Sequence, residues 1–239
     1  MSKPFLHIEN LTKRHPGRGK SAGVVVFERL NLGIERGEFV SLIGHSGCGK
    51  STLLNLIAGL EQPSDGYVFV GGKAVRGPGL ARGVIFQNHS LLPWLSALGN
   101  VAFSVRARHP DWTRTQIHDH SLRFLRLVGL DTVAERRPAQ LSGGMRQRVG
   151  IARAFAIEPE ILLMDEPFGA LDAFSRGSIQ DQLLELWQQV RRTIVMITHD
   201  VDEAIYLSDR VVVMSDGPNS RIVDTVSIDL PRPRLRSEL

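Results

Sequence analysis

The sequence predicts an α/β fold with a mostly parallel sheet, an N-terminal antiparallel β region and an inserted helical subdomain. In residues 1–40, apolar and polar residues alternate in short runs, which is typical of antiparallel strands. From residue 39 onward, short apolar runs alternate with helical segments, which favours parallel strands joined by helices. Within residues 88–140 the apolar spacing becomes helical, and three prolines interrupt it, namely Pro93, Pro110 and Pro138.

The individual elements follow from the same patterns. Short apolar runs predict strands at 39–43, 67–70, 84–86, 161–164, 193–198 and 210–214. Helices are expected at 52–60, from the loop at 141–147 to about residue 157, at 179–190 and at 201–207. We expect one domain over residues 1–239, with 88–155 as the helical subdomain and 230–239 as a basic tail. The run PRPRLR at 231–236 is expected to be solvated and poorly ordered.

Composition limits the classes of protein that the chain can represent. Its 239 residues can bury a substantial core, and the contents of 42% hydrophobic and 23% charged residues are ordinary for a globular protein. Neither a membrane span nor a signal peptide is apparent, and the single cysteine, Cys48, fits a reducing compartment, so a cytoplasmic location is expected. The net charge of +4 comes from scattered arginines, so we predict no nucleic-acid partner.

A glycine-rich loop between a predicted strand and a predicted helix carries the strongest signal. Residues 44–52 read GHSGCGKST, the pattern of a P-loop, whose backbone N–H groups wrap a polyphosphate. In that pattern Lys50 reaches the β- and γ-phosphates and the Ser51 hydroxyl ligates Mg²⁺. The core is therefore predicted to be that of a P-loop NTPase that binds ATP and Mg²⁺. The predicted ATP-binding residues in this loop are Gly44, His45, Ser46, Gly47, Cys48, Gly49, Lys50, Ser51 and Thr52.

Two further segments suggest anion and cation chemistry. Residues 141–147 read LSGGMRQ and place a serine and two glycines directly before a predicted helix, whose N-terminus attracts anions. Residues 161–166 read ILLMDE, so a buried strand delivers Asp165 and Glu166 to its C-terminal edge, where parallel sheets bind ligands. Two carboxylates at the end of a buried strand are costly without a cation or a partner.

Together these motifs resemble the ATP-binding cassette (ABC) family, and the resemblance covers nearly the whole chain. It implies a dimer clamped by nucleotide, in which the second loop of one subunit completes the ATP site of the other. Asp165 then helps to hold Mg²⁺ through water, and Glu166 is the general base that polarises the attacking water. The residues that contact the partner's ATP are Ser142, Gly143, Gly144 and Gln147.

The same resemblance assigns three weaker motifs. Gln87, after the strand at 84–86, matches the Q-loop glutamine that reads Mg²⁺ and the attacking water. His199, in the sequence THD, matches the switch histidine that contacts the γ-phosphate. Asp172 follows Glu166 at the spacing of the D-loop, which crosses the dimer interface. The resemblance therefore implies that Glu166, His199 and Gln87 are catalytic, and that Ser51, Gln87 and Asp165 surround the metal.

Two positions leave alternatives open. The family places an aromatic residue on the adenine near the N-terminus, and this chain has His15 there, which stacks with less apolar area than tyrosine. Cys48 lies beside backbone donors and Lys50, and one interpretation is that it is a reactive thiol. The alternative is that Cys48 is a buried and inert small side chain.

Residues 87–103, QNHSLLPWLSALGNVAF, resemble the importers of small anions, closest to nitrate, with sulfonate and taurine importers as the alternative. The resemblance implies a second ATPase subunit, an integral membrane permease and a periplasmic or extracellular solute-binding protein. The chain would then lie on the inner face of the membrane through its permease. The apolar cluster at 91–94 is either local core or the surface that receives a helix of that permease.

Two other classes of function explain the sequence less well. A cassette protein that acts on nucleic acid or ribosomes normally has paired cassettes or a long coiled-coil insertion, and this chain has neither. A P-loop kinase explains residues 44–52 but gives no reason for the loop at 141–147.

Overall fold

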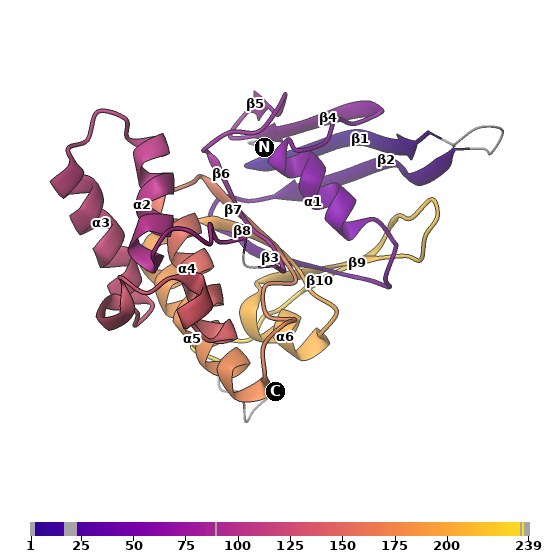
Figure 1. The fold of residues 1–239 in the computed structure, drawn as a ribbon. Coiled ribbons are helices and arrows are strands. Elements are labelled where there is room, and N and C mark those ends of the chain that lie inside the picture. Colours follow the sequence, from indigo (N-terminus) through magenta and orange to yellow (C-terminus); the bar gives the residue numbers. More distant parts are fainter. Residues whose placement is uncertain (1–2, 17–22, 89, 235, 237–239) are drawn as a thin grey trace. The chain divides into compact units, whose positions relative to one another are not determined.

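The computed structural model describes residues 3–16, 23–88, 90–234 and 236, which Figure 1 shows as a ribbon. The chain divides into two compact units. The first consists of Met1–Gly79 and Arg192–Leu239, and the second is Leu80–Arg191. Both units bury aromatic and aliphatic side chains, such as Phe27 in the first and Phe124 in the second.

An antiparallel sheet forms one part of the first unit. Its strands lie in the order β2-β1-β4-β5, and their bounds are Val24–Ile34 (β2), Leu6–His15 (β1), Asp65–Val70 (β4) and Lys73–Ala74 (β5). Along β1 the buried residues Leu6 and Ile8 alternate with His7, which is partly exposed. This alternation is the reason that the strand buries one face and leaves the other more accessible.

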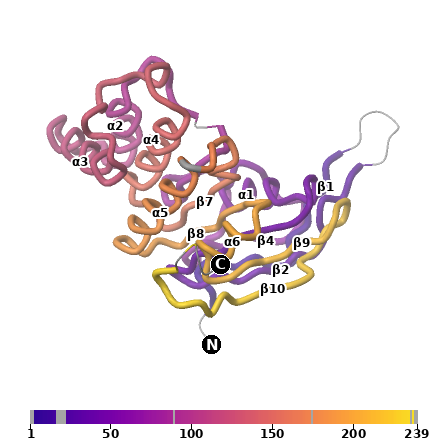
Figure 2. Tube along the Cα trace, turned by 90° about the horizontal axis from the view of Figure 1, so that it is seen from below, coloured from indigo at the N-terminus to yellow at the C-terminus, as the bar shows by residue number. Residues whose placement is uncertain are grey.

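A second set of strands in the first unit is mostly parallel. The order is β10-β9-β3-β8, with bounds Ile222–Ser227 (β10), Arg210–Met214 (β9), Phe39–Ile43 (β3) and Thr193–Ile197 (β8). β3 runs parallel to β8 and β9. β10 is antiparallel to β9, and the two strands can be followed in Figure 2. Helix α1 (Lys50–Ala58) packs on β8, and α6 (Val201–Leu207) packs on β3 and β9.

The second unit joins a short parallel strand pair to a group of helices. Its strands are β6 (Arg82–Ile85) and β7 (Ile161–Asp165), and its helices are α2 (Ala97–Arg108), α3 (Arg114–Leu127), α4 (Gly143–Ala156) and α5 (Ala173–Val190), with 3-10 turns η1 (Asp131–Val133) and η2 (Pro138–Gln140). Helices α2, α3 and α4 pack on one another (Figure 1), and α4 also packs on β6 and α5. Side-chain caps fix where these helices begin, since Ser96 caps α2 and Thr113 forms a capping box with Gln116 at α3.

The predicted fold class is confirmed by this mixture of antiparallel and parallel strands with helices. The bounds of β3, α6 and β9 are those predicted. Helix α5 begins at Ala173, six residues before the predicted start at 179, because Asp172 caps it there. Strand β10 was not predicted at all. Its residues are almost all exposed, so it shows no apolar alternation.

The expectation that residues 231–236 form a solvated tail is wrong for two arginines. Arg234 is only 8% exposed, and its guanidinium donates to the carbonyl oxygens of Ile205 and Ser208, both at 2.6 Å. Arg232 donates to the carbonyl oxygen of Leu207 at 2.6 Å and to Asp209 at 2.8 Å. The last carbonyls of a helix lack partners within the helix, so this part of the chain supplies donors to the C-terminal end of α6.

Replacing Arg234 by alanine should therefore lower the free energy of unfolding by about 1–3 kcal/mol, because the carbonyl oxygens would lose a charged donor. Urea denaturation followed by circular dichroism measures this change. Arg76→Ala, at an exposed arginine of the same unit, is the control and should stay within about 0.5 kcal/mol of the unchanged protein. Equal denaturation midpoints for the Arg234 variant and the unchanged protein would show that the hydrogen bonds of Arg234 contribute nothing to stability.

Candidate functional site

The loop between β3 and α1 has a backbone that only glycine adopts readily. Gly47 and Gly49 have φ angles of 80° and 94°, in the left-handed region. A Cβ on Gly49 would lie 2.5 Å from Cγ1 of Val26, so a side chain there would also collide with β2. Helix α1 begins directly after Gly49 with no side-chain cap and no acidic residue in its first turn. This helix N-terminus therefore presents backbone N–H groups and a positive dipole end to an anion.

Lys50 closes the same loop on itself. Its side chain is buried, and its ammonium donates to the carbonyl oxygens of Gly44 at 2.6 Å and His45 at 2.9 Å. These bonds turn two loop carbonyls toward one cation and hold that cation beside the start of α1. The arrangement concentrates positive charge where the loop is predicted to receive phosphates.

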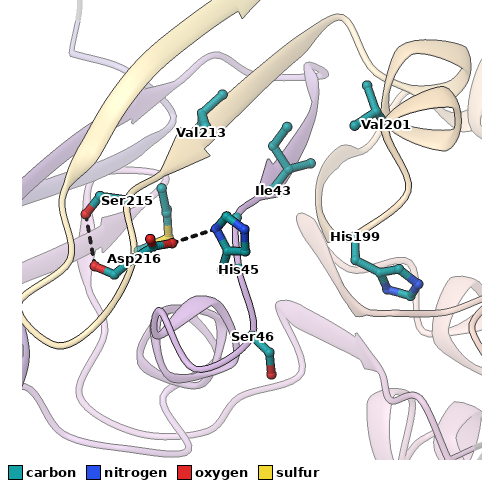
Figure 3. Close-up of a pocket in the computed structure, with 10 residues that line it drawn as sticks. Ile43, His45, Ser46, His199, Val201, Val213, Ser215 and Asp216 are labelled. Carbon is teal, nitrogen blue, oxygen red and sulfur yellow. Dashed lines mark hydrogen bonds and ion pairs between the residues drawn. The ribbon is translucent and has the colours of Figure 1, made fainter.

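A cavity of about 630 Å³ adjoins this loop in the first unit, and Figure 3 shows the side chains around it. His45 and Ser46 line it from the loop, and His199 lines it from the segment after β8. The remaining lining residues are Ile43, Gly44, Val201, Val213, Met214, Ser215 and Asp216. The structure thus brings the predicted switch histidine to the same cavity as the glycine loop.

Within the second unit, Gln87 and Glu166 lie together. The Gln87 amide nitrogen donates to a carboxylate oxygen of Glu166 at 3.4 Å, although the two residues are far apart in sequence. Glu166 directly follows β7 and has a φ angle of 44°, which is uncommon for a residue other than glycine. Such backbone strain often occurs at functional positions. Asp165 is the last residue of β7 and is partly exposed.

The start of α4 combines an exposed serine with a buried glycine. Ser142 caps α4 by accepting from the N–H of Met145 at 3.2 Å, and its side chain is exposed. Gly144 is buried against α5, since a Cβ there would lie 3.4 Å from Cδ1 of Ile179. Gln147 is 0% exposed, which favours a packing role over contact with another subunit's ligand.

Asp172 has a structural contact of its own. Its carboxylate caps α5 by accepting from the N–H of Ser175 at 3.0 Å. Asp172 is at the same time an exposed residue.

The structure shows the surroundings of Cys48 and His15. Cys48 is 0% exposed, which favours the inert alternative over the reactive one. His15 is exposed at the end of β1, where it pairs with Val24, and it does not line the cavity beside the glycine loop.

Sequence reasoning missed the turn between β9 and β10. Ser215 and Asp216 line the cavity, and Asp216 lies 2.5 Å from Nδ1 of His45 in an exposed ion pair. The sequence DGPN at 216–219 signals a turn, but nothing local to it indicates which part of the chain it contacts.

The residues available for a metal suit Mg²⁺ that is held mainly by phosphate. Among the residues that the structure describes, no three His, Cys, Asp or Glu side chains form a cluster that could hold a metal ion. Mg²⁺ in nucleotide sites keeps several waters and binds one or two protein ligands together with phosphate oxygens. Each unit offers donors of this kind, the Ser51 hydroxyl in the first and the Asp165 carboxylate in the second. The glycine loop between β3 and α1, with Lys50 at its end, is that of a nucleotide-binding domain of the P-loop class.

Comparison with known proteins identifies the family. Residues 27–169 match the family model described as ABC transporter. The chain is 48% identical, over 98% of its length and 83% of the relative's, to the bicarbonate transport ATP-binding protein CmpD of Synechocystis sp.. It is 50% identical, over 97% of its length and 84% of the relative's, to the nitrate import ATP-binding protein NrtD of Synechococcus elongatus. The chain belongs to the ABC transporter family, as its motifs predicted.

A solved structure supports the same assignment. The dimeric structure of MJ0796, a bacterial ABC transporter cassette, matches with a TM-score of 0.82 at 32% identity, and the match covers 93% of this chain and 98% of that one. In the part of the chain that the structure describes, none of the helices has both the length and the apolar character needed to cross a membrane.

Proposed function

We propose that this chain is the ATP-hydrolysing subunit of an importer of a small oxyanion, and that it works as a dimer around two Mg·ATP. The observation that carries the proposal is the glycine loop closed by Lys50, with His199 at the same cavity. Residues 1–239 act as one cassette, in which residues 88–155 are the helical subdomain and 230–239 the basic tail. Membership of the ABC transporter family supports ATP hydrolysis as the reaction.

In this proposal the ATP phosphates lie on the N–H groups of residues 44–52, and the Lys50 ammonium leaves the loop carbonyls to meet the β- and γ-phosphates. Ser51, Asp165 and Gln87 would hold Mg²⁺, which would supply positive charge to the phosphate oxygens. His15 contacts the adenine from the end of β1. The exposed position of His15 is compatible with that contact.

Hydrolysis requires a water in line with the bond to be broken and a group that accepts its proton. Glu166 takes that proton as the water oxygen bonds to the γ-phosphorus and the bond to the departing ADP oxygen breaks. Gln87, which donates to Glu166, orients the carboxylate and the water. His199 would donate to the γ-phosphate.

The second subunit completes each site. Exposed Ser142 at the start of α4, with Gly143 and Gly144, would bind the γ-phosphate held by the partner. Asp172 would cross the interface while it caps α5. Gln147 supports the loop from within. Because ATP then touches both subunits, it stabilises the closed dimer more than the open one, and hydrolysis removes that difference.

The permease is proposed to dock on the segment that follows Gln87. Trp94 is 66% exposed and Phe103 on α2 is 61% exposed, which favours a contact surface over local core. The segment is held firmly, since the buried side chain of Asn100 accepts from the N–H of Leu92 at 2.7 Å and donates to the carbonyl oxygen of Ser96 at 3.0 Å. A large aromatic side chain presented on such a fixed loop is suited to anchor an apolar helix of a partner.

The relatives' names support the class of solute. One is a nitrate import protein and another a bicarbonate transport protein, both transporters of small planar oxyanions. We therefore propose nitrate or a similar oxyanion, captured outside by a solute-binding protein, with this chain held at the inner face of the membrane by its permease. Taurine and alkyl sulfonates are the alternative, on the resemblance of residues 87–103.

Glu166→Gln should separate ATP binding from hydrolysis. The amide keeps the size of the side chain but accepts no proton, so turnover should fall by about 10² or more. Mg·ATP should still bind, and the uncleaved nucleotide should hold two subunits together, which size-exclusion chromatography with and without Mg·ATP measures. Adding Ser142→Arg should abolish that dimer. A dimer unaffected by Ser142→Arg would exclude the proposed arrangement of subunits.

Trp94→Glu should uncouple the subunit from transport. We expect the purified chain to hydrolyse ATP as before, while its co-purification with the permease and the solute uptake both decrease. The matched control is Tyr67→Glu, another aromatic residue with 63% exposure, on β4, which should leave both unchanged. Aggregation of the Trp94 variant, with normal behaviour of the Tyr67 variant, would indicate instead that Trp94 belongs to a local core.

The solute is tested in proteoliposomes that contain the permease, both ATPase subunits and the binding protein. Nitrate or bicarbonate should raise ATPase activity more than taurine or an alkyl sulfonate does, because the binding protein closes on its own solute. Glu166→Gln is the control for background hydrolysis. Stimulation by taurine above that by nitrate and bicarbonate would assign the chain to the sulfonate branch.

A further inference from the structure

The turn between β9 and β10, residues 215–221, lies directly against the glycine loop in the first unit. We propose that this turn positions the glycine loop for phosphate binding and that Ser220 is its main positioning residue. The proposal rests on the proposed function, because it assumes that residues 44–52 bind the phosphates of ATP. All of the contacts that support it lie within the first unit.

Ser220 makes the central contact. Its side chain is 1% exposed, and its hydroxyl donates to the carbonyl oxygen of Cys48 at 2.6 Å, with the carbonyl oxygen of Val26 further away at 3.2 Å. A serine hydroxyl has one proton, so the shorter bond to Cys48 is the main one. Buried hydroxyl groups that bond to a backbone carbonyl fix the orientation of that carbonyl.

The orientation of the Cys48 carbonyl determines that of the next N–H group. The peptide bond is planar and trans, so the carbonyl of Cys48 and the N–H of Gly49 point in opposite directions. Because Ser220 holds the carbonyl on the side of the β9–β10 turn, the N–H of Gly49 points away from that turn. Gly49 is the residue directly before α1, where the loop donors are expected to meet phosphate.

A second contact restricts the neighbouring peptide. Gly217 packs so closely on the loop that a Cβ there would lie 2.8 Å from the carbonyl oxygen of Gly47 and 3.4 Å from Cα of Cys48. No side chain fits at residue 217 without displacing the glycine loop. The exposed ion pair of Asp216 with His45 adds a third contact, which is weak because water screens it.

The turn can act as a support because β2 holds it in place. The N–H of Asn219 donates to the carbonyl oxygen of Val25 at 2.8 Å, and the N–H of Ser220 donates to that of Val26 at 2.9 Å. Val26 is also the residue that meets Gly49. The glycine loop is thus held between β2 and a turn that is itself bonded to β2, which reduces the conformational freedom that ATP binding would otherwise have to remove.

The experiment compares variants of the full chain by isothermal titration with Mg·ATP and Mg·ADP and by thermal denaturation. Ser220→Ala should raise the Kd of both nucleotides about five- to tenfold, the effect of losing one hydrogen bond that fixes the site. Ser220→Thr, which keeps the hydroxyl, should restore the Kd to within about twofold. Measured hydrolysis should show the same change in KM with little change in kcat.

The matched control is Ser121→Ala. Ser121 is likewise buried, at 0% exposure, and its hydroxyl donates to a backbone carbonyl, that of Ile117, at the same 2.6 Å, but it lies in α3 of the second unit. Its loss should lower the melting temperature as much as the loss of Ser220 and leave the Kd unchanged. A Ser220→Ala protein that likewise loses only thermal stability would overturn the proposal, as would an equal Kd increase in Ser220→Thr.

If Ser220→Ala does not fold, Gly217→Ala is the second test of the proposal. Its added methyl group would press on the glycine loop and would remove no hydrogen bond. It should raise the Kd of both nucleotides, and an unchanged Kd would overturn the proposal. Failure of the unchanged protein to bind Mg·ATP would contradict the proposed function itself, so the two failures are distinguishable.

Discussion

The site in the first unit depends on the hydrogen bonds from the Lys50 ammonium to two backbone carbonyls of the glycine loop. Carbonyls of Gly44 and His45 face the ammonium, and the glycines that follow occupy left-handed conformations. A planar trans peptide directs its carbonyl and its N–H to opposite sides, so the bonds to Lys50 also fix the directions of the N–H groups of His45 and Ser46. The strand before the loop and the helix after it are both buried, so the loop begins and ends at fixed points.

In the second unit, residues that we propose to act on the nucleotide also maintain local structure. Ser142 caps α4 and Asp172 caps α5. Glu166 directly follows β7 and has a strained backbone conformation. A ligand or subunit that competes for a capping side chain acts directly on the start of a helix, where about 1 kcal/mol is at stake. This gives a physical route by which binding at these residues alters the helices behind them.

The sequence predicted those features whose cause is local. Apolar runs defined β3 and β9 to the residue, and the spacing of glycine, lysine and serine identified the glycine loop. Features that depend on distant contacts were not predictable. Arg234 reads as a basic tail until the carbonyls at the end of α6 are placed beside it, and Ser220 reads as an ordinary turn residue until its bond to Cys48 is seen. The solvent-exposed strand β10 lacked any apolar pattern to reveal it.

Only a few residues separate Gln87, which bonds to Glu166, from the exposed side chain of Trp94. Gln87 bonds to Glu166, and beyond it Arg153 donates to the carbonyl oxygen of Ser90 at 2.7 Å, while Asn100 holds Leu92 and the start of α2. Trp94 lies between these points of attachment and is exposed. Hydrogen bonds thus hold residues 90–100 at several points, and these bonds resist local bending of that stretch. In the proposed function Gln87 would meet Mg²⁺ and Trp94 would meet the permease, so the two proposed contacts lie close together in the sequence.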